Sequence, residues 1–138
     1  PNVAQLAAIR RAVDDEFALL CCDYPGYGLI LPTLALGGQG TANVTGNIIP
    51  EEMAAMSRPW RSFEDVTRSR ELYFRYLPLL EMMYSLTSPV PVKTAVGLLG
   101  LPAGRVRRPL PDMAPERIQQ LETLLAELGV RDKYGVKP

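Results

Sequence analysis

Short apolar runs alternate with helical patterns along the first half of the chain. Apolar residues recur at helical spacing over 3–13, which predicts an amphipathic helix. The run FALLCC at 17–22 is brief, continuously apolar and followed by a turn signal. A short helix has the same pattern, but the length favours a strand buried on both faces. The stretch 28–36 is apolar nearly all round, as in a covered helix, and the β-leaning stretch 41–45 predicts a second strand. Pro50 is placed to begin a third helix.

The alternation of helices and strands over residues 1–59 is typical of an α/β fold with parallel strands. Two parallel strands do not form a stable sheet alone, because both faces and both edges need cover. We therefore expect this part of the chain to be an incomplete α/β unit.

From residue 60 onward the pattern is helical. Residues 62–65 (SFED) form a capping-box pattern in which Asp65 replaces the commoner Glu or Gln. Apolar and aromatic residues then recur at spacings of three, four or seven, which predicts one long helix over 63–84, kinked at Pro78. We expect residues 60–138 to form a helical domain.

Prolines and glycines mark the later elements. The stretch 88–93 (SPVPVK) predicts an extended entry to another helix, which ends at Gly97 or Gly100. A last helix begins at Pro115 and is capped by Gly129. We expect the polar tail at 131–138 to be loose.

Composition removes several classes of function. The 138 residues carry 15 Lys and Arg against 15 Asp and Glu, and this neutral balance argues against a dedicated nucleic-acid or anionic-membrane binder. The chain has no histidine, which excludes Ser-His and Cys-His nucleophile pairs and His-ligated metals. We expect no metal and no cofactor. No apolar run approaches the ~18 residues of a membrane helix.

The cysteines and the N-terminus bear on the cellular context. Cys21 and Cys22 are adjacent, a pair that is difficult to bridge, and they indicate reduced core thiols of a cytoplasmic protein. The chain opens Pro-Asn-Val with neither an initiator Met nor a signal-peptide pattern. We therefore expect that further sequence precedes Pro1.

Several residues are candidates for chemistry, and each also has a structural interpretation. The glycine run 37–40 follows a helix and precedes a strand, the wrong order for a phosphate loop, so it favours a helix-capping turn. Asp23 lies at the carboxyl end of the first strand, where α/β folds bind ligands, but it is equally an ordinary turn residue. On the second strand, Asn43 and Thr45 alternate with Ala42 and Val44, which leaves room for a small substrate or merely for packing.

Cations and aromatic residues of the second half favour structural roles. Lys93 could form a Schiff base, but a lysine at a helix start is more often solvated or ion-paired. Arg105, Arg107 and Arg108 indicate a solvated surface or an interface. The aromatic group that includes Tyr73 is typical of a helix-packing stripe.

Motifs spread over nearly the whole chain resemble the dihydrodipicolinate synthase and N-acetylneuraminate lyase family, in the order and spacing of its C-terminal portion. They are FALL at 17–20, LPTLALGGQG at 31–40, VTGN at 44–47, PVPVK at 89–93 and LGLP at 99–102.

This resemblance implies the C-terminal part of a (β/α)8 TIM barrel, with its last two strands, followed by a C-terminal helical domain. Residues 1–59 would supply the last βα units of the barrel and residues 60–138 the helices. The intact parent would be a homotetramer that forms a Schiff base between a lysine and a 2-keto acid such as pyruvate. That lysine would lie upstream of Pro1, so we expect this chain alone to be inactive.

The resemblance also implies where a substrate would be contacted. Cys22 and Asp23 fall where the family often has Gly-Asp, and Ala42 falls where an apolar residue touches the keto acid. Asp23 and Tyr24 would shape the barrel mouth after the first of these two strands, and Ala42 with Asn43 the wall on the second. Cys22 in place of Gly, and Gly46 where Ala is common, suggest a divergent aldolase or dehydratase-like subgroup.

A rival hypothesis is a non-enzymatic, mainly helical interaction domain whose two strands join the sheet of a partner. The lack of a complete catalytic set in the chain supports it. The coding sequence upstream of Pro1 would discriminate the two hypotheses, because a strand ending in Gly-x-Lys favours the enzyme and a start codon favours the interaction domain.

Overall fold

The structure, a computed structural model, describes residues 2–22 and 27–137. The chain divides into two compact units. The first, here called the strand unit, comprises Pro1–Asn43 and Glu51–Phe74, and the second, the helical unit, comprises Val44–Pro50 and Arg75–Pro138. The domain boundary expected between residues 59 and 60 stays a prediction.

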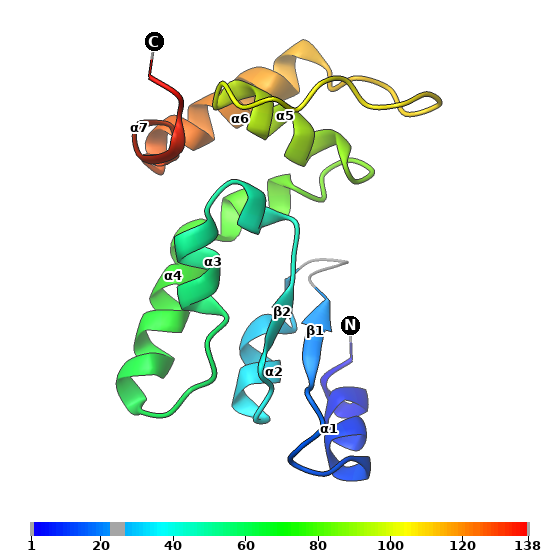
Figure 1. Ribbon diagram of the computed structural model, residues 1–138, viewed down its shortest axis with the longest axis vertical. Helices are drawn as coiled ribbons and strands as arrows, with labels where there is room; N and C mark the ends of the chain where they lie inside the picture. Colours follow the sequence, from blue (N-terminus) through cyan, green and yellow to red (C-terminus); the bar gives the residue numbers. More distant parts are fainter. Residues whose placement is uncertain (1, 23–26, 138) are drawn as a thin grey trace. The chain divides into compact units, whose positions relative to one another are not determined.

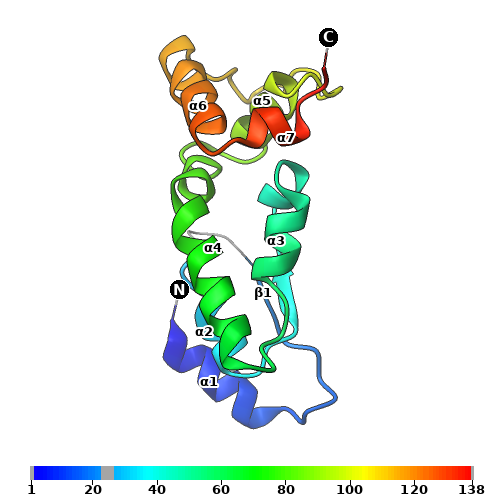
Figure 2. The same cartoon turned by 90° about the vertical axis from the view of Figure 1, so that its left-hand side faces the viewer.

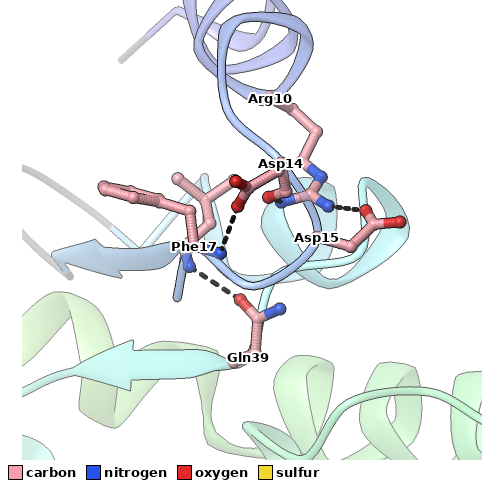
Figure 3. Close-up of polar contacts among 6 residues, drawn as sticks. Arg10, Asp14, Asp15, Phe17 and Gln39 are labelled. Atoms are coloured by element: carbon pink, nitrogen blue, oxygen red, sulfur yellow. Dashed lines mark hydrogen bonds and ion pairs between the residues drawn. The ribbon is translucent and has the colours of Figure 1, made fainter.

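The strand unit begins with the predicted amphipathic helix, α1 (Val3–Ala12). Asn2 caps it, because the Asn2 Oδ1 accepts hydrogen bonds from the backbone N–H groups of Ala4 (2.9 Å) and Gln5 (3.3 Å). The loop after α1 is also held by polar contacts: Arg10 pairs with Asp15, and the Phe17 N–H donates to Asp14 Oδ1 at 3.1 Å (Figure 3).

Two short parallel strands follow, β1 (Leu20–Cys22) and β2 (Gly40–Ala42), as Figure 1 shows. They are shorter than the predicted runs 17–22 and 41–45. Just before the strands, the Gln39 N–H donates to Leu19 O at 2.9 Å and the Leu19 N–H donates to Gln39 Oε1 at 2.7 Å (Figure 3). The Gln39 side chain thus replaces a ladder bond and fixes where pairing starts.

The expectation that the first strand is buried on both faces is wrong for the residues described. Cys21 is buried, whereas Leu20 is 54% exposed and Cys22 is exposed. Successive side chains of a strand point to opposite faces. One face is covered, and α2 (Ile30–Ala35) contacts both strands within this unit (Figure 1). The expectation of two core thiols therefore holds for Cys21 only.

The glycine run after α2 is the predicted helix-capping turn. Gly37 has a left-handed backbone (φ +79°), and its N–H donates to Leu34 O at 3.0 Å. The next N–H, of Gly38, donates to Thr33 O at 2.8 Å, which completes a Schellman motif. A Cβ at Gly38 would overlap the Thr33 methyl group and lie 3.1 Å from Leu19 O. Gly38 therefore lets the turn pack directly against the start of β1.

The predicted strand 41–45 is wrong beyond Ala42. Thr45 lies in a 3-10 turn, η1 (Thr45–Asn47), which belongs to the helical unit, so Asn43 and Thr45 do not alternate along a strand. The Ile48 N–H donates to Thr45 O at 2.9 Å, and Asn47 Nδ2 donates to Val44 O at 2.8 Å. These local bonds favour a turn over continued strand pairing.

Helix α3 (Pro50–Met56) begins at the predicted proline, and α4 (Phe63–Met82) confirms the predicted long helix. The capping box is formed: Asp65 N–H donates to Ser62 Oγ at 3.2 Å, and Asp65 Oδ2 accepts from Ser62 N–H at 2.9 Å. The Arg61 N–H also donates to Asp65 Oδ2, at 2.8 Å, and with the Ser62 bonds it lowers the pKa of the Asp65 carboxyl. Helix α4 passes Pro78 and remains one element.

In the helical unit, α5 (Val90–Leu98) replaces the expected extended stretch 88–93. Pro91 lies in the first turn of α5, where a proline's missing N–H is no loss, so a proline-rich entry is compatible with helix. The Lys93 N–H already donates to Pro89 O at 3.0 Å. Gly100, with a left-handed φ of +79°, follows the end of this helix, whereas Gly97 lies inside it.

The C-terminal segment differs from the loose tail that the sequence predicts. Helix α6 (Pro115–Glu127) and the left-handed Gly129 are as predicted. A further helix, α7 (Val130–Tyr134), packs against α6, as the view in Figure 2 also shows. Val130 is buried, and the Val136 N–H donates to Leu99 O at 2.8 Å. The buried side chain of Val130 and the hydrogen bond from Val136 to Leu99 thus hold the mainly polar C-terminal segment in place.

Candidate functional site

The carboxyl ends of β1 and β2 bring together three of the four residues predicted to contact substrate. Cys22 and Ala42 are register partners at the last position of the strand pair, and Asn43 follows directly. Cys22 and Ala42 are exposed and Asn43 is half-buried. The fourth residue, Asp23, lies outside the described residues, and so does Tyr24. Small and polar groups therefore gather at the edge of the parallel pair where α/β folds bind ligands.

A chain of polar side chains supports this edge. Asn43 Nδ2 donates to Thr41 Oγ1 at 3.0 Å, and Thr41 Oγ1 lies 2.8 Å from Ser57 Oγ. Ser57 directly follows α3, so its hydroxyl ties the strand to the end of that helix. Sequence reasoning missed Ser57, since no local signal links residues that are 16 positions apart. Thr41 lay within the predicted strand but was not singled out.

The adjacent cysteines separate into two environments because they alternate along β1. Cys21 points to the buried face and Cys22 to the exposed one. At the strand ends the chain thus offers a thiol, a methyl group and an amide. These groups can shape a small site and hydrogen-bond a polar ligand.

The chemistry considered for Lys93 does not fit its surroundings. Its Nζ donates a hydrogen bond to Arg105 O at 3.0 Å, so the amine is bound to backbone within the helical unit. A Schiff base forms from a neutral, unencumbered amine in a site that excludes water. Arg105 in turn pairs with Asp112 at 2.6 Å, and Arg107 and Arg108 are exposed, as a solvated surface requires.

Residues 2–22 and 27–137 offer neither a metal site nor a membrane-spanning helix. They contain no cluster of three or more Cys, Asp or Glu side chains that could hold a metal ion. None of the helices in these ranges is long and apolar enough to cross a membrane.

A pair of parallel strands with helices between and after them, and small side chains at the strand ends, defines a piece of an α/β fold of the kind that binds ligands at its strand ends. The sequence matches the dihydrodipicolinate synthetase family over residues 1–128. The chain belongs to this family, which confirms the resemblance described above.

Individual relatives agree with this assignment. The chain is 36% identical over 129 residues to the 4-hydroxy-tetrahydrodipicolinate synthase of Archaeoglobus fulgidus, which covers 92% of the chain and 43% of the relative. It is similar to a crystal structure of the Cyanidioschyzon merolae synthase with lysine bound (34% identity, TM-score 0.82, 94% of this chain and 42% of that one).

A prophage protein of the same family from Escherichia coli K12, crystallised in complex with pyruvate, is also similar (30% identity, TM-score 0.73, 94% of this chain and 44% of that one). The chain spans about two fifths of the length of these relatives.

Proposed function

We propose that this chain forms the C-terminal part of a Schiff-base-forming lyase or aldolase that acts on 2-keto acids of the pyruvate type. The observation that carries the proposal is the pairing of Cys22 with Ala42 at the carboxyl ends of two parallel strands. The family relationship supports the reaction class, since relatives bear the name 4-hydroxy-tetrahydrodipicolinate synthase and one family structure contains pyruvate. The two strands would be the last strands of a (β/α)8 barrel, and the helical unit would form most of its C-terminal domain.

In this proposal the chain supplies walls of the substrate site. Ala42 contacts the apolar side of the keto acid, and Cys22 shapes the adjoining floor. Asn43, held by its bond to Thr41, lines the mouth. The intact parent would form the imine on a lysine of the preceding barrel strand. When the substrate's carbon–carbon bond breaks, the protonated imine would take up the bonding electron pair and become an enamine; when the bond forms, the enamine would return that pair to the new bond.

The lysines of this chain are not suited to form that imine. They are Lys93, Lys133 and Lys137, and all belong to the helical unit rather than to a strand. Lys93 is hydrogen-bonded to Arg105 O, and Lys133 lies over the Tyr134 ring at 4.9 Å. We expect the chain alone to have no lyase activity.

Reductive trapping tests this expectation directly. The chain is incubated with pyruvate and borohydride, and its intact mass and peptide masses are measured. We expect no reduced pyruvate adduct, whereas the intact A. fulgidus relative, treated in parallel, should be labelled. A stoichiometric adduct on any of the three lysines would contradict the proposal.

A chimeric enzyme tests whether Ala42 forms a wall of the substrate site. The preceding part of the A. fulgidus synthase is fused to this chain, and trapping by pyruvate is measured. We expect the fusion to be trapped, and expect Ala42→Phe to reduce trapping at least tenfold because the ring would occupy the keto-acid position. Ala35→Phe, an exposed alanine on α2, is the matched control and should trap as the parent fusion does. Equal trapping by the Ala42→Phe fusion would overturn the assignment of this wall.

Sheet addition to a partner protein remains the second candidate function. The exposed Leu20 and Phe17 on and before β1 favour it, because they give an unpaired strand edge an apolar surface. A homotetrameric parent and a cytoplasmic location stay predictions.

A further inference from the structure

A small cavity lies within the strand unit where the chain passes from α3 to α4. Its volume is about 60 Å³, and it is lined by Ala55, Arg58, Trp60, Asp65 and Arg68. This is room for a few water-sized groups but not for a metabolite with a large body. The cavity is separate from the strand-end residues Cys22, Ala42 and Asn43, none of which lines it.

The charge of the lining favours an anion. Among the described residues, the exposed side chains of Arg58 and Arg68 have no hydrogen-bond or ion-pair partner. The opposing charge, Asp65, is already occupied: its Oδ2 accepts from the backbone N–H groups of Arg61 and Ser62 and from Ser62 Oγ. Two guanidinium groups against one carboxylate leave the cavity with a net positive charge.

A buried donor without an acceptor points the same way. Trp60 Nε1 is buried and has no hydrogen-bond partner in the structure, although its residue lines the cavity. An indole nitrogen can only donate, so an acceptor oxygen in the cavity would satisfy it. A buried donor left unpaired is destabilising, and an acceptor in the cavity would remove that cost.

The walls of the cavity are held in place before any ligand arrives. Ser69 Oγ donates to Met56 O at 2.8 Å, which fastens α4 to the end of α3. The capping bonds of Asp65 fix the first turn of α4. Arg68 is one turn further along the same helix, so these two anchors fix the backbone that carries its side chain.

We propose that this cavity binds a small oxyanion, of the size of formate or acetate, which bridges Arg58 and Arg68 and accepts a hydrogen bond from Trp60 Nε1. Guanidinium groups present paired donors that match the two oxygens of a carboxylate. The indole adds a third donor for one of these oxygens.

Trp60 is the single tryptophan of the chain, so its indole N–H gives one resonance that reports on the site. The ¹⁵N-labelled chain is titrated with sodium formate, with the ionic strength held constant by sodium gluconate, an anion too large for the cavity. We expect the indole proton to move downfield in a saturable way as it gains an acceptor. An unchanged resonance, or a shift that grows linearly without saturation, would overturn the proposal.

Charge-matched variants separate binding from general screening. Arg58→Gln and Arg68→Gln should each weaken formate binding at least tenfold. Arg70→Gln removes the same charge from the same helix on a side about 200° away, and should bind within twofold of the original chain. Equal weakening by all three variants would show a nonspecific field effect, and the site would be rejected.

A second measurement does not depend on the resonance. An anion that binds only the folded chain raises the unfolding temperature. Formate should raise it in the original chain and in Arg70→Gln, and the rise should vanish in Arg68→Gln and shrink in Trp60→Phe. If citrate raised it more than formate did, the binding surface would be open rather than this cavity, and the proposal would be wrong.

Discussion

The strand unit and the helical unit differ in how much apolar surface they leave in water. In the strand unit the large exposed apolar residues include Phe17 (52%) and Leu20 (54%), which flank the start of β1. In the helical unit, α6 buries Leu121 and Leu125 almost completely. Both units are built from similarly apolar sequence, so composition does not explain the difference.

Geometry explains it. An amphipathic helix has one apolar stripe, which a neighbouring helix can cover. A parallel sheet has two faces and two edges, and all of them need cover. With β1 and β2 as its strands, the described sheet is covered in part, and the exposed positions alternate as the pleat dictates. The apolar stripe of α6 is therefore covered, whereas alternate positions of β1 stay exposed.

The largest expected difference in unfolding free energy is between two leucine-to-alanine substitutions, one in each unit. Leu121→Ala removes a side chain that is 0% exposed and should lower the free energy of unfolding by about 2–5 kcal/mol. Leu20→Ala, at an exposed strand position, should change it by less than about 0.5 kcal/mol. Urea unfolding followed by circular dichroism measures both. A large loss in Leu20→Ala would mean that this face of β1 is covered and would remove the contrast.

Two glycine-to-alanine substitutions compare how tightly the backbone is packed in the two units. Gly38→Ala should cost about 2 kcal/mol, because the new Cβ would press on the Thr33 backbone and side chain and on Leu19 O. Gly97→Ala, inside α5 with nothing within 4 Å of the new Cβ, should stabilise the chain by about 0.5–1 kcal/mol. Thermal unfolding of the two variants gives the signs. Destabilisation by Gly97→Ala would show that this helix position is less open than its surroundings indicate.

These contrasts also explain which elements could be predicted from sequence. The long α4 and the capped α6 carry their signals locally, in the capping box at Ser62 and in the pair Pro115 and Gly129. The predicted strand 17–22 was too long because strand pairing begins only where Gln39 meets Leu19, twenty residues away. Local pattern fixes helices, and long-range partners fix strands.

The candidate site also contains residues that could be predicted from sequence and residues that could not. The family resemblance pointed to Ala42 and Asn43, whereas the sequence pattern placed both within a strand over 41–45 and not at the strand end where the structure has them. The Thr41–Ser57 contact could not be predicted, because it depends on how α3 returns to the strand. The turn at Thr45 depends on a local backbone hydrogen bond, which a β-leaning sequence pattern does not reveal. The order of α7 depends on the buried Val130 and on one backbone hydrogen bond, which a mainly polar sequence does not reveal either.

Helix capping should make the stability of the strand unit depend on acid. Helix α4 begins with Ser62 and Asp65, whereas α5 and α6 begin with no side-chain cap. Ser62→Ala should cost about 1 kcal/mol. The folded chain holds the pKa of Asp65 below its ordinary value, chiefly through the Arg61 N–H. Its contribution is therefore present above about pH 4 and is lost as the pH falls through the lowered pKa.

The measurement is the free energy of unfolding between pH 6 and pH 2 for the original chain, Asp65→Asn and Glu64→Gln. We expect Asp65→Asn to be less stable at pH 6 and to converge with the original chain at low pH. Glu64→Gln, an exposed residue in the same turn, should keep the acid-dependent loss. A constant gap between Asp65→Asn and the original chain at all these pH values would contradict the role of the carboxylate.

The smallest expected difference lies between two ion pairs among the described residues, Arg10 with Asp15 in the strand unit and Arg105 with Asp112 in the helical unit. The Arg10 side chain is 17% exposed, pairs with Asp15 and also donates to Asp14 O at 3.2 Å (Figure 3). Arg105, which pairs with Asp112, is 86% exposed. A double-mutant cycle with alanine should give a coupling of about 0.5 kcal/mol for Arg10 and Asp15 and about 0.2 kcal/mol or less for the other pair. Both couplings should disappear in 1 M salt, where the Debye length is about 3 Å. A stronger coupling for Arg105 and Asp112 would show that burial of the arginine does not determine the strength of these ion pairs. The contact of Arg10 with the loop after α1 would then add no stability to the strand unit.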